Sequence, residues 1–151
     1  MSRDRACRPA VPSERPLLEA LQRRASLQNP GDREALLANP DAIDLPLAQI
    51  TGGHVFVAAR GQTILGFAAV LPREDGDAEL DALFVEPDAW RQGIGRLLVE
   101  HCSEVARTRG SAALHVVGNP HAEDFYRSCG FERFGTVATR FGDGQLLRRR
   151  L

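Results

Sequence analysis

Two glycines, Gly93 and Gly95, stand beside arginines where a strand-like segment gives way to a helix-like one. The first backbone amides of a helix have no partner within the helix, and the helix dipole adds roughly half a positive charge at that end. Phosphate oxygens are acceptors that suit both features. Because glycine has no side chain, a ligand can approach this backbone closely, and Arg91 and Arg96 can add charge-assisted contacts. The turn therefore predicts binding of a phosphate-bearing small molecule.

Several kinds of phosphate loop contain such glycines. A Walker A loop needs a lysine after its glycines, and this chain has no lysine. A dinucleotide fingerprint needs a third glycine, but Leu98 stands at that position. Two interpretations remain at this point: a site for the pyrophosphate of coenzyme A, and a strand-to-helix turn that needs glycine for its geometry alone.

The elements that must position this turn alternate between strands and helices. Apolar residues at helical spacing predict helices at 14–27, 32–38, 45–50 and 93–109, and one that opens at Asn119-Pro120. Apolar runs bounded by turn residues predict strands at 8–11, 54–60, 63–71, 78–85, 112–117, 131–141 and 145–151. The strand at 78–85, the helix at 93–109 and the strand at 112–117 are expected to form a parallel βαβ unit inside a mixed sheet.

Composition limits the kind of protein. The 151 residues suit one domain, 1–151, with one hydrophobic core. A formal net charge of -1 predicts no general attraction to nucleic acid or to an anionic membrane. No apolar run approaches the roughly 20 residues of a membrane span, and the charged, proline-rich start lacks a signal-peptide core. These features favour a cytoplasmic protein.

Sulfur and imidazole groups give no metal or disulfide signal. The odd number of cysteines and the absence of a CxxC pair predict reduced thiols at Cys7, Cys102 and Cys129. The histidines lack the spacing of metal ligands, so no metal site is expected; they are His54, His101, His115 and His121.

Two segments resemble the GNAT N-acetyltransferase superfamily. Residues 83–87, LFVEP, followed by 92–98, QGIGRLL, look like its acetyl-CoA motif, and residues 119–131 look like its second cofactor segment. The hairpin that ends ILGFA at 64–68 and the RPA start at 8–10 also match, so the resemblance covers nearly the whole chain in the right order. It implies a GNAT-like α/β (α+β) fold. That fold has a mixed, mostly antiparallel sheet of about six to seven strands, flanked by helices, with the βαβ unit at its centre.

The resemblance also implies acetyl-CoA as co-substrate. The residues that match the family's cofactor contacts are Phe84, Val85, Arg91, Gln92, Gly93, Ile94, Gly95, Arg96, Asn119 and Tyr126. For Asn119, a second interpretation stays open, because Asn before Pro is also a good helix N-cap. One position departs from the family: Trp90 stands where Arg or Gln is usual, and Arg91 can substitute from the next position.

The family transfers an acetyl group to an amine, usually by direct attack. The amine must first be neutral, although a lysine-like amine has a pKa of about 10.4. Glu79 and Asp81, two apart on one expected strand, are the candidate bases, acting directly or through water; the alternative is that they are solvated acids. The amide near Phe84-Val85 is the family's oxyanion donor. Tyr126, the chain's only tyrosine, is the candidate acid for the thiolate; the alternative is a core aromatic.

The sequence therefore predicts an N-acetyltransferase that acts on a primary amine of a small molecule or a peptide. A different class stays open, a non-catalytic regulator or sensor that binds acyl-CoA, and so does a binder of another nucleotide. The acceptor site would be formed by residues 14–50 and 131–151. Arginines there favour an acidic acceptor, although surface solubility explains them equally well; they are Arg15, Arg23, Arg24 and Arg33. The family often forms dimers, so a homodimer is compatible with the resemblance.

Overall fold

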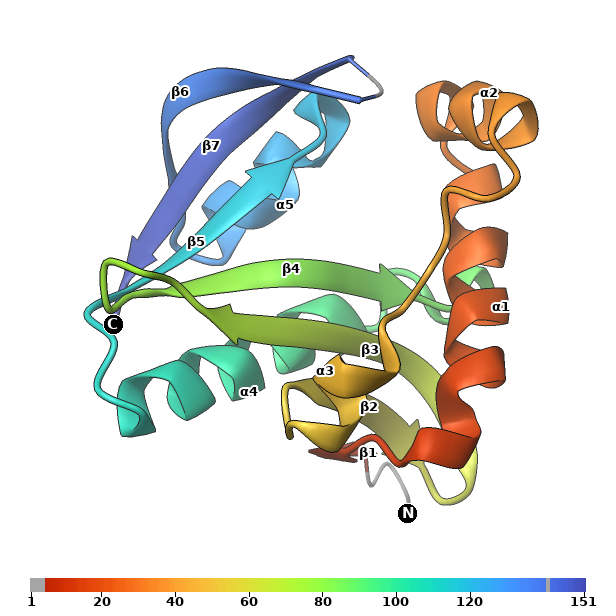
Figure 1. Cartoon of the computed structure of the whole chain (residues 1–151), viewed down its shortest axis with the longest axis horizontal. Helices are drawn as coiled ribbons and strands as arrows, with labels where there is room; N and C mark the ends of the chain where they lie inside the picture. The colour runs from red at the N-terminus through yellow and green to blue at the C-terminus, as the bar shows by residue number, and fades with distance from the viewer. Residues whose placement is uncertain (1–4, 141) are drawn as a thin grey trace. The chain divides into compact units, whose positions relative to one another are not determined.

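The computed structural model describes residues 5–140 and 142–151, and it contains the alternating strands and helices expected (Figure 1). The strands are β1 (Arg5–Pro9), β2 (Val55–Arg60), β3 (Thr63–Pro72), β4 (Ala78–Val85), β5 (Ala113–Gly118), β6 (Glu132–Thr139) and β7 (Gly142–Arg150). The helices are α1 (Arg15–Leu27), α2 (Pro30–Ala38), α3 (Leu47–Thr51), α4 (Ile94–Thr108) and α5 (Glu123–Ser128). Short 3-10 turns lie at η1 (Pro12–Glu14), η2 (Pro87–Ala89) and η3 (Pro120–Ala122).

The strands of the described residues form one 7-stranded sheet in the order β1-β2-β3-β4-β5-β7-β6. β4 and β5 are parallel and pair through Ala78 with Leu114 and Glu79 with His115. The pairs β1–β2, β2–β3, β5–β7 and β6–β7 are antiparallel. Because α4 connects β4 to β5, the predicted βαβ unit and the mixed, mostly antiparallel sheet are both confirmed.

Two predicted elements differ most from the structure in their boundaries. The first strand, expected at 8–11, lies earlier, because residues 5–9 pair with β2 and Pro12 already begins a 3-10 turn. The last hairpin was expected to turn around residues 142–144, but Thr139 pairs with Gly142, so the turn comes before β7. Gly144 instead lies within β7, where an added Cβ would approach the Val117 side chain to 2.7 Å. Phe141, the expected end of the preceding strand, lies outside the described residues.

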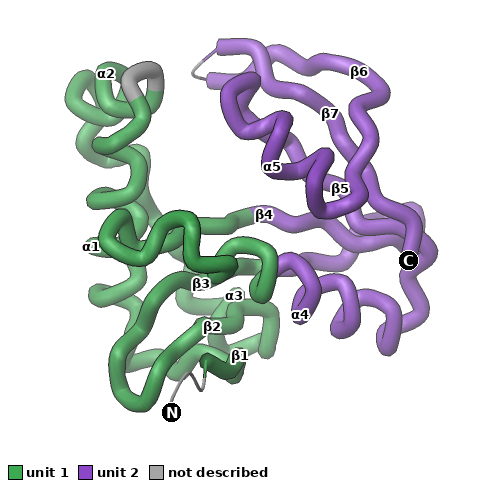
Figure 2. The backbone as a smooth tube through the Cα atoms, turned by 180° about the vertical axis from the view of Figure 1, so that it is seen from behind, with its two compact units in different colours: residues 1–69, 82–98 green, residues 70–81, 99–151 purple. Residues whose placement is uncertain are grey.

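The chain divides into two compact units (Figure 2). The first unit comprises residues 1–69 and 82–98, and the second comprises residues 70–81 and 99–151. The expectation of one domain over 1–151 stays a prediction. α4 begins in the first unit and continues in the second.

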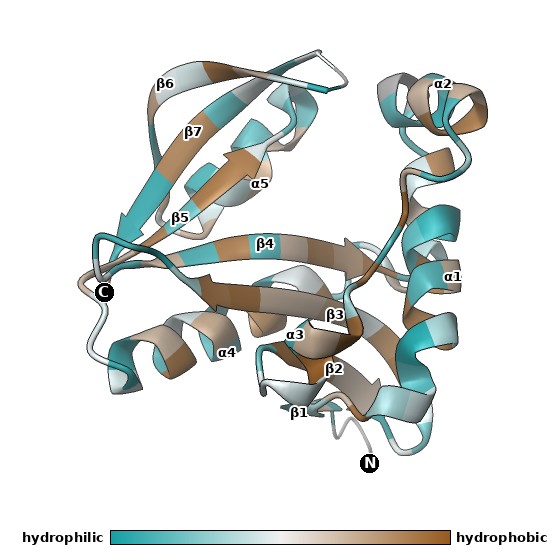
Figure 3. Cartoon of the chain, in the orientation of Figure 1, coloured by the Kyte–Doolittle hydropathy of each residue, from teal (hydrophilic) through white to brown (hydrophobic). Residues whose placement is uncertain are grey.

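The core of the first unit lies between α1 and the strands β2 and β3. α1 buries Leu18, Leu21 and Ala25, which recur at helical spacing, as the sequence predicts. β2 and β3 are predominantly hydrophobic (Figure 3), and Phe67 of β3 is fully buried. Burial of such a side chain contributes about 1.5–3 kcal/mol.

The core of the second unit lies on the face of its strands that packs against α4 and α5. Leu114 and Leu147 are fully buried. Arg149, which pairs with Leu114, reaches the side chain of Glu100 on α4 at 2.9 Å. Because side chains alternate along a strand, His115 lies on the opposite face. Within the described residues, no helix has both the length and the apolar character needed to cross a membrane.

Candidate functional site

The glycine turn lies in the first unit, between the end of β4 and the start of α4. The Gly93 carbonyl accepts a hydrogen bond from the Leu97 amide at 3.0 Å, which makes Gly93 the residue that caps α4. Its φ is 82°, a left-handed conformation that favours glycine. Arg91 has a φ of 66° and is the one non-glycine described residue with positive φ. That conformation costs about 1–2 kcal/mol, and backbone strain of this kind concentrates at binding sites.

The capping position of Gly93 makes Ile94 and Gly95 the first residues of a 15-residue helix. Their amides come before the first intrahelical hydrogen bond, so they are the donors that an anion would use. The local geometry is therefore that of the predicted anion-binding turn. The assignment of individual cofactor contacts to residues 84–85 and 91–96 stays a prediction.

Trp90, the departure from the family pattern, closes this turn. Its indole Nε1 donates a hydrogen bond to the Val85 carbonyl at 2.8 Å, so the side chain folds back onto the end of β4. The preceding backbone is also fixed, because the Glu86 amide donates to the Leu65 carbonyl of β3 at 2.8 Å. The family's usual side chain is thus replaced by one that holds the turn in shape.

Arg5 brings a positive charge to the turn that the sequence analysis missed. Its guanidinium donates to the Gln92 carbonyl, and a Cβ added at Gly93 would lie 3.7 and 3.8 Å from its terminal nitrogens. The two hydrogen-bonded residues are 87 positions apart, and Arg5 is one of many arginines. No local pattern could have singled it out.

A bidentate ion pair joins α1 to the end of β4 within the first unit. Arg24 donates through Nε and Nη2 to the two carboxylate oxygens of Glu86, at 2.8 and 2.6 Å. The hydrogen bond to Glu86 raises the pKa of Arg24 further above its usual value. The pair fixes α1 relative to the residue that leads from β4 into the glycine turn.

The arginines of the expected acceptor region mostly bind the protein itself. Besides Arg24, Arg15 donates to the Asp44 carboxylate at 2.9 Å and to a backbone carbonyl, and Arg23 donates to the Pro40 carbonyl at 3.1 Å. These contacts give three of the four arginines a structural role. They weaken the argument that the arginines select an acidic acceptor.

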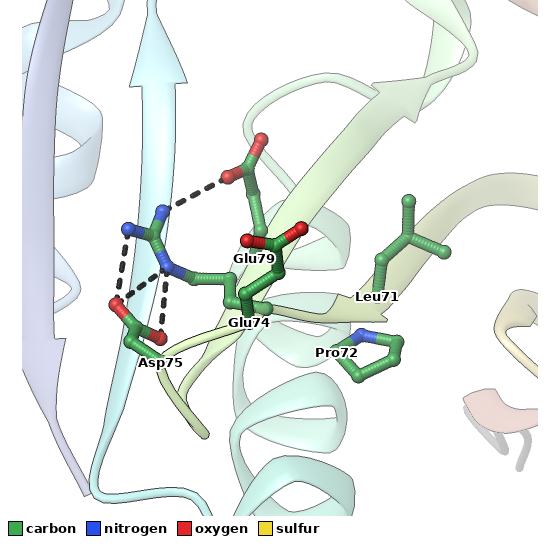
Figure 4. Close-up of a pocket in the computed structure, with 6 residues that line it drawn as sticks. Leu71, Pro72, Glu74, Asp75 and Glu79 are labelled. Carbon is green, nitrogen blue, oxygen red and sulfur yellow. Dashed lines mark hydrogen bonds and ion pairs between the residues drawn. The ribbon is translucent and has the colours of Figure 1, made fainter.

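The two candidate bases lie in the second unit, on one face of β4. Ala78 and Leu80 are buried, whereas Glu79 is half-buried and Asp81 is exposed, which is the alternation expected of a strand. Glu79 Oε1 accepts a hydrogen bond from Arg73 at 3.1 Å. Glu79 also lines a pocket of about 530 Å³ (Figure 4). The lining residues are Leu71, Pro72, Arg73, Glu74, Asp75 and Glu79.

A histidine–aspartate pair lies beside Glu79, and the sequence had not indicated either residue as a candidate for catalysis. His115 Nε2 is 3.0 Å from Asp77 Oδ2, and the strand register places His115 opposite Glu79. The ligand-type atoms of Asp75, Asp77 and His115 lie within 4.8 Å of one another. Arg73 and backbone amides already bind these carboxylates, so a metal ion would have to displace them and face a guanidinium. The absence of a metal site stays a prediction.

Tyr126 is buried on α5 in the second unit. Its ring packs edge-on against Phe125 at 5.2 Å and Phe131 at 5.4 Å between centroids. A Cβ added at Gly118 would come within 3.0 Å of the ring, so glycine there makes room for it. Burial raises the pKa of the Tyr126 phenol well above its usual range. The hydroxyl is therefore protonated at neutral pH and available as a donor.

Asn119 stands at the N-cap position of η3, as expected from its place before proline, but its side chain makes no capping hydrogen bond to that turn. The interpretation of its side chain as a helix cap is therefore wrong. Its contact with a cofactor stays a prediction.

The sequence and the fold were compared with those of known proteins. A sequence model described as "Acetyltransferase (GNAT) family" matches residues 18–131. Among curated protein sequences, none matches. Similar solved structures include a GCN5-related N-acetyltransferase from Rhodopseudomonas palustris, with 22% identity, a TM-score of 0.78, and coverage of 97% of this chain and 95% of that chain.

Two further solved structures share the fold. The PaiA N-acetyltransferase from Thermoplasma acidophilum, in complex with coenzyme A, has 16% identity and a TM-score of 0.76, covering 98% of this chain and 99% of that chain. The ribosomal-protein-alanine N-acetyltransferase from Brucella melitensis has 26% identity and a TM-score of 0.69, covering 97% and 99%. The family match includes the glycine turn, both candidate bases, Asn119 and Tyr126. On this match, and with the sheet order and βαβ unit described above, the chain belongs to the GNAT acetyltransferase family.

Proposed function

We propose that the protein binds acetyl-CoA and transfers the acetyl group to a primary amine of a small molecule or peptide. The observation that carries the proposal is the left-handed Gly93 that caps α4 within the family match. A related fold in complex with coenzyme A, the Thermoplasma PaiA enzyme, supports the choice of cofactor.

In this proposal the glycine turn binds the pyrophosphate of the cofactor. The amides of Ile94 and Gly95 donate to the pyrophosphate, with Gln92, Arg91 and Arg96 around it. Charge-assisted hydrogen bonds of this kind contribute about 1.5–3 kcal/mol each. Arg5 adds positive charge at the same turn, because its guanidinium lies against Gly93.

The reaction is direct attack of the neutral amine on the thioester carbonyl. The new C–N bond forms, the C–S bond breaks, and the sulfur leaves with the electron pair. Glu79 or Asp81 takes the amine proton directly or through water. A backbone amide near Phe84 and Val85 stabilises the oxyanion, and one such donor lowers a barrier by about 2.7–4 kcal/mol.

Tyr126 serves the leaving thiolate. A phenol has a reference pKa of about 10 and a thiol of about 8.5, so complete proton transfer from tyrosine to a thiolate is uphill by about 2 kcal/mol even before burial acts. Burial raises the pKa of Tyr126 and increases this difference. Tyr126 therefore donates a hydrogen bond that stabilises the thiolate, and solvent completes the protonation.

Two measurements test the proposal. In a melting assay, coenzyme A at 100 times its dissociation constant stabilises the protein by about 2.7 kcal/mol, whereas ATP and NAD do not. With acetyl-CoA and a panel of primary amines, free thiol appears. A melting temperature that coenzyme A does not move would contradict cofactor binding. A shift without thiol release from any amine would support the alternative, a non-catalytic acyl-CoA sensor.

A further inference from the structure

His115 carries a buried nitrogen that the fold leaves without a partner. The residue is 9% exposed, and its Nδ1 has no hydrogen-bond partner among the described residues. Its other nitrogen, Nε2, is bonded to Asp77. Leaving a buried polar atom unpaired costs about 1–3 kcal/mol, so an orphaned nitrogen in a native fold calls for an explanation.

Asp77 determines which nitrogen carries the proton. A carboxylate only accepts, so in the neutral imidazole Nε2 is the protonated nitrogen and Nδ1 holds a lone pair. Asp77 cannot easily rotate away, because its Oδ1 accepts from the amides of Ala112 and Ala113 at 3.3 and 3.2 Å. The fold thus fixes an imidazole with its basic nitrogen unused.

Strand pairing places His115 directly beside Glu79, one of the two candidate bases, on the same face of the sheet. His115 pairs with Glu79 of β4 on one side and with Arg148 of β7 on the other. Since Arg149 reaches α4, this row lies on the face of the second unit that α4 does not cover. Glu79 lines the pocket on that unit.

Resting on the function proposed above, we infer that His115, in place of Glu79 or Asp81, is the catalytic base for the acceptor amine and that Asp77 is its positioning residue. Nδ1 accepts the proton of the attacking amine through bridging water while the C–N bond forms and the C–S bond breaks, because His115 pairs with Glu79, five residues before Phe84 on β4. The electron pair leaves with sulfur, which takes a proton from solvent. The imidazolium then releases its proton to water, so the balance is one amine and one thioester to one amide and one thiol.

The charges around the imidazole suit this role. Asp75, Asp77 and Glu79 stabilise the transient imidazolium, and Arg73 already balances Asp75 and Glu79. From β7 and β6, the Arg148 guanidinium stacks on the Phe134 ring at 4.7 Å, and the Phe134 ring meets the His115 ring edge-on at 6.1 Å. Within the described residues, the charged groups around a positive charge on His115 are therefore the carboxylates of Asp75, Asp77 and Glu79 and the guanidinium groups of Arg73 and Arg148, with the Glu132 carboxylate next in the row beside Arg148.

Two variants test the inference against thiol release and coenzyme A binding. His115→Gln removes the base, and we expect kcat to fall by about 100-fold or more with an unchanged coenzyme A shift in melting temperature. Asp77→Asn keeps the acceptor oxygen for the two amides but donates to Nε2, which moves the imidazole proton to Nδ1; we expect a loss of similar size. His54→Gln and Glu104→Gln are matched controls outside this pair and should retain wild-type kcat.

One further readout separates chemistry from structure. In ¹⁵N-histidine NMR of the unaltered protein, the His115 signal should show unprotonated Nδ1, and in Asp77→Asn it should show protonated Nδ1. This NMR comparison requires neither enzymatic turnover nor a folded His115→Gln variant.

The outcomes are distinct. Wild-type kcat in His115→Gln, or protonated Nδ1 in the unaltered protein, overturns the base role and leaves the proposed function standing. No thiol release by the unaltered protein with any amine overturns the proposed function and the base role together. Loss of kcat in both variants with retained coenzyme A binding supports the inference.

Discussion

Gly93→Ala is the sharpest test of the glycine turn. Among the described residues, a Cβ at this position meets only the Arg5 guanidinium, at 3.7 and 3.8 Å, which is ordinary contact. The substitution therefore adds no clash, and its cost comes from the φ of 82° alone. Holding alanine in that conformation costs about 1–2 kcal/mol, which lowers the melting temperature of a protein of this size by about 2–8 °C.

The same substitution should weaken cofactor binding. If the turn relaxes to relieve the strain, the Ile94 and Gly95 amides change direction. Loss of one charge-assisted hydrogen bond, about 1.5–3 kcal/mol, weakens binding of coenzyme A by about tenfold or more. Chemical denaturation gives the stability change, and titration calorimetry with coenzyme A gives the affinity.

Gly61→Ala is the matched control. Gly61 has a φ of 61° in the turn between β2 and β3, and an added Cβ there meets no atom of the described residues within 4 Å. It should show a similar loss of stability with unchanged affinity for coenzyme A. Equal affinity in the two variants would refute the anion-binding role of the turn. A Gly93→Ala protein as stable as wild type would refute the conformational argument.

Other consequences can be tested in parallel. Trp90→Phe removes the indole hydrogen bond that closes the turn, and we expect urea denaturation to show a loss of about 1 kcal/mol. Tyr126→Phe keeps the aromatic packing but removes the donor, so kcat for thiol release should fall by about 10- to 100-fold while coenzyme A binding is retained. The hydrogen bond from Arg8 holds the pKa of Glu14 below its ordinary value. The pair therefore stabilises the fold above the ordinary glutamate pKa, and this contribution is lost as pH falls through the lowered pKa. In Arg8→Gln, the free energy of unfolding should fall less at acid pH than it does in the wild type. Denaturation curves taken at several pH values measure this difference.

Local features were predictable because short-range physics determines them. β4 has the bounds that the sequence predicts, since apolar residues that alternate with acids between turn residues specify a strand. α4 begins one residue after the glycine expected to open it, because that glycine caps the helix. The strand, turn and helix that present the anion-binding amides could therefore be read from neighbouring residues.

Contacts between distant residues could not be predicted in the same way. Arg5 reaches the turn across 87 positions, and Asp77 meets His115 across 38. Both contacts depend on strand pairing and register, which the sequence pattern leaves open. The role of Trp90 depends on the direction of one carbonyl at the end of β4, and no residue type specifies that direction.

The hydrogen bond that folds Trp90 onto β4 also gives the protein an optical reporter. Trp90 is the sole tryptophan of the chain, so fluorescence excited at the red edge of indole absorption comes from this one side chain. The indole is 40% exposed and is fixed next to the glycine turn, so its emission is sensitive to any ligand that settles there. The residue that departs from the family pattern can thus report, without a label, on the occupancy of the turn that its hydrogen bond stabilises.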